Sequence, residues 1–249
     1  PTQEHVGPNY NRAAYISHSN TNKGIINKIY QLVRNYTLRK KLALVQKYTG
    51  LRTGNLLDVG AGIGSFAHTV QQAGWQVTGL EPDATAVANA QTLYGLQLLP
   101  LQQLFTLPAA SFNAITLWHV LEHVHDLHGY MQQFGTVLAP GGVLVIAVPN
   151  YTSADAAYYG AAWAAYDVPR HLYHFSPQSI QQLASKHGFT VRTQLPMLFD
   201  SFYVSMLSEQ YKNHRSNLLA AFWQGLVSNA KRGKQNQHCS SVIYILAKA

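Results

Sequence analysis

The sequence feature that most limits the possible folds is a glycine-rich turn between an apolar segment and a helical one. Residues 55–59 read NLLDV, and Gly60, Gly62 and Gly64 follow at alternate positions before a helical pattern begins. Glycine lets a backbone turn tightly and approach a ligand closely. The spacing is G-x-G-x-G, whereas the dinucleotide fingerprint would need a glycine at Ser65. The segment therefore predicts a strand, a ligand-binding turn and a helix.

Strand and helix patterns alternate through most of the remaining chain. Apolar runs with strand character cover residues 76–80, 96–101, 114–118, 143–148, 190–194 and 242–246. Helical patterns separate most of these runs, and Ser176-Pro177 is typical of a helix start. Because no complete crossover helix separates the last two strands, they favour an antiparallel hairpin at the C-terminal edge. The alternation predicts an α/β fold with a doubly wound, seven-stranded, mostly parallel sheet.

The chain is expected to divide into two parts. Residues 1–52 form an N-terminal extension: an arm without periodicity and then apolar residues at helical spacing from Ile25 onward. This extension is expected to act as a lid on the substrate side. Residues 53–249 form the main domain, with a helical insertion at about 197–235 that is rich in apolar residues. Such an insertion would cover a pocket or form a dimer interface, so the oligomeric state stays open.

Charge is distributed unevenly along the chain. The net charge is +8 overall, with +8 in residues 1–52, −6 in residues 53–185 and +6 in residues 186–249. An acidic core module with cationic ends favours an anionic substrate, a membrane surface or a nucleic acid as partner, or merely keeps the protein in solution.

Composition excludes several other classes of protein. Hydrophobic residues make up 47% of the 249 residues, which excludes global disorder. The lone cysteine, Cys239, excludes a disulfide framework within the chain and indicates a reducing compartment. The apolar runs are far shorter than the roughly 20 residues of a membrane span. We therefore expect no membrane span and a cytoplasmic location.

Two carboxylates accompany the glycine turn. Asp58 lies within the first strand, where dinucleotide-binding folds carry an apolar residue, and Glu81 ends the second strand. A carboxylate at the second position can accept hydrogen bonds from both hydroxyls of a ribose. The turn and the two acids together predict a nucleoside-containing cofactor.

These motifs resemble those of the class I S-adenosylmethionine-dependent methyltransferases, a family with a Rossmann-like sheet. LLDVGAGIG is similar to the family's first motif, GLEP to its acidic loop, LWHVLEHV to its fourth-strand motif and LAPGGVLVIAVPN to its fifth. The chain is similar in particular to the ubiquinone-pathway O-methyltransferases and to related bacterial proteins, mainly over residues 55–195. The resemblance implies S-adenosylmethionine as methyl donor and S-adenosylhomocysteine as product.

The resemblance also implies roles for individual residues. Asp58 would organise the loop or meet the methionine ammonium, Glu81 would hold the ribose, and Gln102 would replace the acid that contacts adenine in the family. The other positions implied to touch the cofactor are Gly60, Ala61, Gly62 and Gly64 beneath it, Pro82 beside the adenine and His119 near the methionine.

Methyl transfer from a sulfonium depends mainly on alignment of the acceptor atom with the methyl group. A hydroxyl acceptor also benefits from a base that takes its proton. Candidate catalytic residues are His119, His123, His171 and His174. His119, Glu122 and His123 have the spacing of one helical face, so they brace the next helix, act as a base, or bind a divalent metal. Bracing is the interpretation we favour, and no metal ligand is assigned.

The sequence as a whole predicts an enzyme that methylates an oxygen, less readily a nitrogen, of a small molecule such as a sugar, phosphorylated or phenolic metabolite. The alternatives are a nucleic-acid methyltransferase that uses the basic ends, or a non-catalytic cofactor-binding module. Nucleic acid is disfavoured because the [DNS]-P-P-[YF] sequence of many base methylases is replaced by WHVL at residues 118–121. The glycine spacing and Asp58 disfavour a nicotinamide oxidoreductase most strongly.

Overall fold

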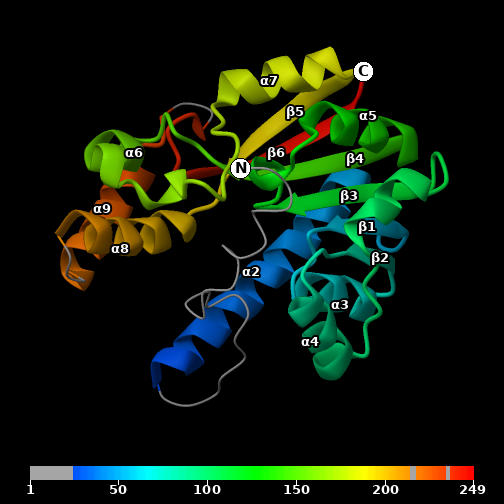
Figure 1. Cartoon of the computed structure of the whole chain (residues 1–249), viewed down its shortest axis with the longest axis horizontal. Helices are drawn as coiled ribbons and strands as arrows, with labels where there is room; N and C mark the ends of the chain where they lie inside the picture. The colour runs from blue at the N-terminus through cyan, green and yellow to red at the C-terminus, as the bar shows by residue number, and fades with distance from the viewer. Residues whose placement is uncertain (1–24, 214–216, 234–235) are drawn as a thin grey trace.

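The computed structural model describes residues 25–213, 217–233 and 236–249, so the whole of the predicted N-terminal arm lies outside the described residues. Its centre is a six-stranded sheet in the order β2-β1-β3-β4-β6-β5 (Figure 1). The strands are β1 (Asn55–Val59), β2 (Gln76–Leu80), β3 (Phe112–Trp118), β4 (Leu138–Pro149), β5 (Phe189–Pro196) and β6 (Ser241–Lys248). β1 to β4 pair in parallel, and β6 is antiparallel to both β4 and β5. The doubly wound sheet and its antiparallel C-terminal edge are confirmed.

The predicted strand at 96–101 is reduced to one isolated bridge on the outer edge of β2. Leu99 bridges Leu80, its N–H donates to the carbonyl of Gly79 at 2.9 Å, and its carbonyl accepts the N–H of Glu81 at 2.9 Å. Pro100 follows directly and has no N–H with which to continue a ladder. The chain then enters the 3-10 helix η3 (Leu101–Thr106). The described sheet therefore has six strands rather than the seven predicted.

Helices cover both faces of the sheet. The helices are α2 (Ile25–Thr49), α3 (Ser65–Gln72), α4 (Ala84–Tyr94), α5 (Leu127–Val137), α6 (Ala154–Tyr159), α7 (Pro177–Lys186), α8 (Asp200–Asn213) and α9 (Leu218–Ala230). Leu56 of β1 packs in the core with α2 and α3, while its neighbour Leu57 packs in the core with α5 and α7. This alternation follows from the two-residue period of a strand, and it gives the sheet a separate hydrophobic core on each face.

Several helix starts agree with the sequence. Ser176 accepts the N–H of Ser179 and closes a capping box with Pro177 in the first turn, as the Ser-Pro pair predicted. Asp83, expected to cap the helix after β2, accepts the N–H of Ala86 at 2.7 Å. Local capping chemistry thus determines where the helices beside the site begin.

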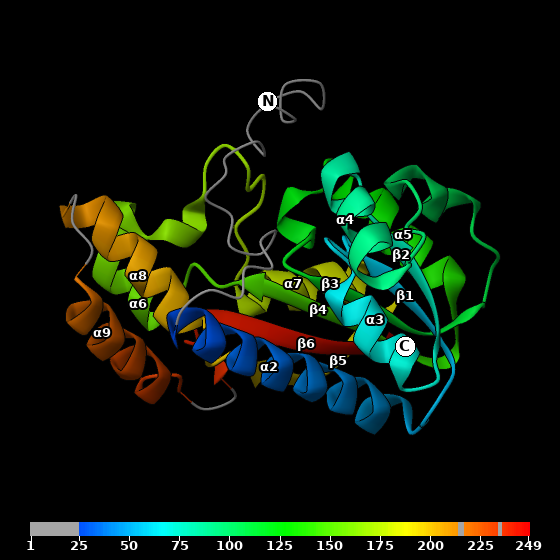
Figure 2. The same cartoon turned by 90° about the horizontal axis from the view of Figure 1, so that it is seen from below.

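α6, α8 and α9 gather at the opposite side of the molecule from α3 and α4 (Figures 1 and 2). In Figure 2, α2 runs along one face of the sheet towards this group. In the part of the chain that the structure describes, no helix is both long and apolar enough to cross a membrane.

Candidate functional site

The glycine turn lies at the carboxyl end of β1 and is tied to the neighbouring strand. The N–H groups of Gly60 and Ala61 both donate to the carbonyl of Leu80, at 2.8 and 2.9 Å. Gly64 then precedes α3 with a left-handed backbone, and its N–H donates to the carbonyl of Ala61. In parallel α/β sheets this edge is where ligands bind.

Two of the glycines are required for different reasons. Gly60 has a φ of 69°, and a Cβ there would lie 2.4 Å from Cγ2 of Val120. Gly62 has a φ of 56°, but a Cβ there would meet nothing within 4 Å. Gly60 is therefore fixed by packing against the segment after β3, whereas Gly62 faces open space that a ligand can fill.

Glu81 ends β2 and closes the glycine turn. Its Oε2 accepts the N–H of Gly62 at 2.7 Å, and its Oε1 accepts the N–H of Asp83 at 2.9 Å. The residue is 8% exposed. These two bonds orient the Glu81 carboxylate towards the glycine turn, where a carboxylate can accept hydrogen bonds from hydroxyl groups.

Asp58 lies beneath the turn, buried in β1. Its Oδ1 accepts the hydroxyl of Thr116 at 2.7 Å. Burial raises the pKa of Asp58 to about 7, against the opposing effects of Thr116 and of the Lys41 ammonium. Burial likewise lowers the pKa of Lys41 to about 8, although Asp200 and Asp58 oppose the change. Lys41 comes from α2 and lies over the ring of Trp118, 4.1 Å from its centre.

His119 follows β3 and joins two carboxylates. Its Nε2 lies 2.8 Å from Oδ2 of Asp200, and its Nδ1 lies 3.3 Å from Oε1 of Glu122. Burial alone would lower the pKa of His119, but Asp200 and then Glu122 outweigh it and raise the pKa to about 10. His119 is therefore an imidazolium at neutral pH, and because both of its N–H groups face carboxylates it cannot accept a proton.

A second histidine cluster surrounds Glu122. Glu122, His123 and His171 each offer a ligand atom, and these atoms all lie within 4.8 Å of one another. Oε2 of Glu122 is buried without a hydrogen-bond partner. The sequence grouped His119 with Glu122 and His123; in the structure His119 contacts Glu122 and also Asp200, while His171 joins Glu122 and His123 as the third possible ligand. Two imidazoles and a carboxylate are a donor set that suits zinc better than magnesium.

The ring of His171 has a defined tautomer. Its Nδ1 lies 2.8 Å from the carbonyl oxygen of Ala165 and therefore donates to it, which leaves the lone pair on Nε2. Burial, followed by the neighbouring His123, lowers the pKa of His171 to about 4, although Glu122 and Asp167 oppose the shift. At neutral pH His171 is therefore neutral, whereas His119 is charged.

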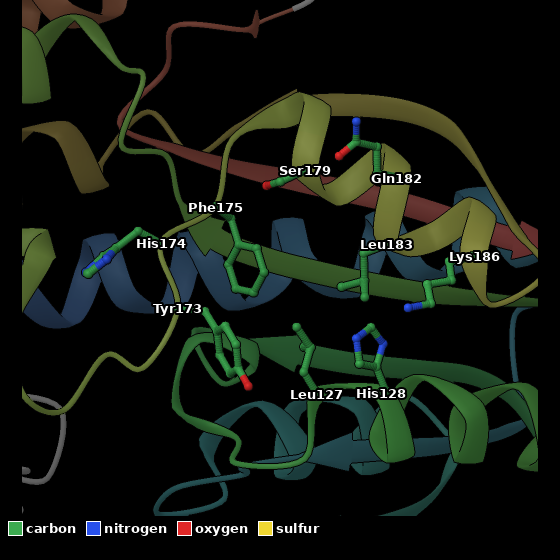
Figure 3. Close-up of a pocket in the computed structure, with 9 residues that line it drawn as sticks. All are labelled: Leu127, His128, Tyr173, His174, Phe175, Ser179, Gln182, Leu183 and Lys186. Carbon is green, nitrogen blue, oxygen red and sulfur yellow. The ribbon is translucent and has the colours of Figure 1, made fainter. Parts of the chain in front are cut away.

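Three of the predicted residues lie further out. Pro82 and Gln102 are exposed, Pro82 after β2 and Gln102 in η3. Nε2 of His174 bonds the carbonyl of Tyr166 at 2.9 Å. His174 lines a surface cavity of about 340 Å³ between α5 and α7, where its ring points away from the other lining residues (Figure 3). The structure therefore does not bring His174 into the group formed by Glu122, His123 and His171.

Sequence reasoning missed Lys41 and Asp200 as members of the site. Lys41 is one of nine basic residues in the first 52, and helical spacing alone does not single it out. Asp200 carried a weak signal, because it is one of only two acids among residues 186–249. Both side chains come from helices that are remote in sequence from the motifs they meet.

Comparison with known proteins assigns this chain to a family. Residues 30–194, more than half of the chain, match the family model described as a methyltransferase domain. The chain belongs to this methyltransferase family. A ubiquinone biosynthesis O-methyltransferase of Rhodopseudomonas palustris (strain HaA2) is 27% identical over 163 residues, which cover 61% of this chain and 63% of the relative. The match thus leaves more than a third of that relative's length uncovered.

Two further matches extend over more of this chain. A probable S-adenosylmethionine-dependent methyltransferase of Mycolicibacterium smegmatis is 25% identical over 213 residues, covering 81% of this chain and 76% of the relative. The crystal structure of magnesium protoporphyrin IX methyltransferase from Synechocystis PCC 6803 with bound S-adenosylhomocysteine covers 94% of this chain and 91% of its own. At 14% identity and a TM-score of 0.58, it is similar in fold.

Proposed function

We propose that this chain transfers the methyl group of S-adenosylmethionine to an oxygen of a small molecule. The observation that carries the proposal is the glycine turn at the carboxyl end of β1, in which Gly62 faces open space and donates to a buried Glu81 at 2.7 Å. The names of the R. palustris and M. smegmatis relatives, an O-methyltransferase and a probable S-adenosylmethionine-dependent methyltransferase, support the oxygen acceptor and the donor respectively.

The charges of the site suit the zwitterionic methionine end of this cofactor. Asp58 offers a carboxylate for its ammonium, and Lys41 offers an ammonium for its carboxylate. The two side chains lie close enough for the charge of Lys41 to lower the pKa of Asp58. Glu81, at the end of β2, would accept hydrogen bonds from the ribose hydroxyls, and exposed Pro82 and Gln102 would border the adenine. When bound, the cofactor supplies the activated methyl group.

The histidines would have different roles at the acceptor end of the site. The His119 imidazolium, whose two N–H groups face Asp200 and Glu122, would place a fixed positive charge beside the acceptor. Neutral His171, with its lone pair on Nε2, is the better group to take a hydroxyl proton. His123 would support His171, since the two ring centres are 4.7 Å apart.

The acceptor and the compartment are part of the same proposal. Cationic ends around an acidic middle favour an anionic acceptor, such as a phosphorylated metabolite, over a neutral one. Cys239 is buried, and burial raises the pKa of its thiol to about 11, which suits an inert thiol in the reducing cytoplasm.

The first test is calorimetric titration of the purified chain with S-adenosylhomocysteine. We expect micromolar binding by the wild type and a loss of at least about tenfold in Glu81→Ala, since two backbone donors and the ribose lose their acceptor. Asp126→Ala is the matched control, because Asp126 caps α5 by accepting the N–H of Gly129 and lies outside the proposed site. No binding by the wild type, or equal binding by Glu81→Ala, would contradict the proposal.

A further inference from the structure

Helix α9 presents its large apolar side chains outward. The residues it buries are small or polar: Ala221, Gln224, Gly225 and Ser228. Its exposed large apolar residues are Leu218, Leu219, Phe222, Trp223 and Leu226, and of these Leu219 is 84% and Trp223 68% exposed. A helix on a protein surface normally has the opposite arrangement. These five residues are called the α9 apolar face below.

The α9 apolar face is a continuous and firmly oriented surface. Its members are spaced at i, i+1, i+4, i+5 and i+8, which places them on one side of the helix. Phe222 stacks on Phe202 of α8, with ring centres 5.3 Å apart. A Cβ on Gly225 would lie 2.6 Å from the same Phe202 ring, so the two helices are in close contact. This packing fixes the outward direction of Leu219 and Trp223.

The sequence that flanks this face carries only positive formal charge. From Gln210 to Ala249 the sequence contains six lysine and arginine residues and no aspartate or glutamate. Lys231 and Arg232 are exposed directly after α9. The nearest acids in the sequence are already engaged, Asp200 by His119 and Glu209 by Tyr159 and Asn213.

We propose that the α9 apolar face docks on the surface of a bilayer that contains anionic phospholipid. An interfacial helix of this kind buries Leu, Phe and Trp at the headgroup boundary, while neighbouring bases meet lipid phosphates. A second copy of this chain fits less well, because a two-fold contact through α9 would bring the same acid-free, basic segments together. At 13 residues, α9 lies along such a surface and does not cross it.

Cosedimentation with vesicles tests this docking. We expect the wild-type chain to bind vesicles of phosphatidylcholine and phosphatidylglycerol, to bind pure phosphatidylcholine at least about tenfold more weakly, and to release in about 0.5 M salt. Leu219→Glu should weaken binding by at least about tenfold. Leu93→Glu is the matched control, because Leu93 is also an exposed leucine but lies on α4, on the other side of the molecule (Figure 1).

Trp223 provides a second readout that does not depend on loss of binding. Trp75 and Trp163 are 2% and 1% exposed, and Trp118 is covered by Lys41, so Trp223 is the tryptophan that a bilayer would newly shield. We expect vesicles to shift the emission to the blue in the wild type, and Trp223→Phe to bind equally well without that shift. Vesicle binding unchanged by Leu219→Glu would overturn the proposal. The proposal would also be overturned if the wild-type chain does not bind vesicles but forms a dimer that Leu219→Glu dissociates.

Discussion

His119 shows how one side chain can hold distant parts of the chain together. It has a φ of 59°, which is uncommon for a residue other than glycine. Asp200 of α8 and Glu122 bind its two ring nitrogens, although 34% of the side chain remains exposed. Because backbone strain of this kind persists only where surrounding contacts impose it, the two carboxylates have a structural role as well as an electrostatic one.

Replacing Asp200 with asparagine should therefore lower the pKa of His119 from about 10 towards its ordinary value of 6.5. Asn keeps the shape of Asp but removes the charge that contributes most to raising this pKa. A histidine titration followed by NMR measures the shift. Asp167→Asn is the control, since its carboxylate pairs with Arg170 instead. An unchanged His119 pKa in Asp200→Asn would contradict this assignment.

The same ion pair should make stability depend on pH in a defined direction. The folded pKa of His119 is raised above the unfolded value of 6.5, so its contribution is complete below pH 6.5 and is lost as the pH rises to about 10. The difference in unfolding free energy between the wild type and Asp200→Asn should shrink across this window. Urea unfolding at both ends of the window measures it, and a constant difference would refute the coupling.

Substitution by alanine should have different effects on stability and cofactor binding at Gly60 and at Gly62. Gly60→Ala places a Cβ 2.4 Å from Val120, so we expect a loss of about 2–4 kcal/mol in unfolding free energy from strain and overpacking. Gly62→Ala meets nothing, so its loss should be limited to about 1–2 kcal/mol of backbone strain. Gly62→Ala should nevertheless weaken S-adenosylhomocysteine binding at least about tenfold, because the proposed cofactor fills that space. Thermal unfolding and calorimetry separate the two effects, and normal binding by Gly62→Ala would place the cofactor elsewhere.

The residues of the site that the sequence could predict are those in local motifs. The turn from Gly60 to Gly64 and the strand-terminal Glu81 follow from short-range patterns, and the structure brings them within hydrogen-bond distance. Lys41 and Asp200 could not be found in this way, because their place depends on how α2 and α8 pack over the sheet edge. His171 joined Glu122 for the same reason: Leu172 and Tyr173 donate to the carbonyl of Glu122 across a long loop.

At the scale of elements, Asp155 links α6 to α9 and β6. This fully buried carboxylate accepts hydrogen bonds from Nε1 of Trp163 at 2.8 Å, from Ser228 of α9 at 2.7 Å and from Ser240, just before β6, at 2.7 Å. The three donors come from separate segments: one follows α6, one lies in α9 and one precedes β6. The position of α9, and with it the orientation of the α9 apolar face, therefore depends on this polar contact as well as on packing against α8.

Asp155→Ala should destabilise the chain by about 3 kcal/mol or more, because it leaves three buried donors without an acceptor. Ser228→Ala removes only one donor and should cost about 1–2 kcal/mol. Urea unfolding compares the two variants. S-adenosylhomocysteine binding should persist in both, since Asp155 takes no part in the glycine turn. Equal stability of Asp155→Ala and the wild type would show that the contact contributes nothing.

The predicted elements show where local patterns are sufficient. Strands and helices with strong periodicity and caps, such as α4 after Asp83 and α7 after Ser176, agree with the structure. The strand expected at residues 96–101 is apolar enough to pair, but Pro100 removes a ladder donor and only Leu99 forms a bridge. Apolar character thus predicts burial next to a sheet, while backbone hydrogen-bonding capacity decides whether a strand extends.

At the scale of the whole molecule, α2 completes one of the two cores. Val45 is fully buried with Leu56, Val70 and Val145, and the partly buried Leu42 packs against the same cluster. In Figure 2 this helix lies along the sheet rather than apart from it. The proposed division at residue 52 therefore separates two parts that share a hydrophobic core, even if the N-terminal part also covers a substrate.

A chain of residues 53–249 should consequently fail to unfold cooperatively, because the face that packs α2 would be exposed to water. Val45→Ala in the full chain is the milder comparison, with an expected loss of about 2 kcal/mol and an intact cooperative transition. Near-UV circular dichroism during heating distinguishes a packed core from a loose one. A cooperative transition in the shortened chain would instead show that α2 is a separable lid, and the site would then be completed by Lys41 only when that lid closes.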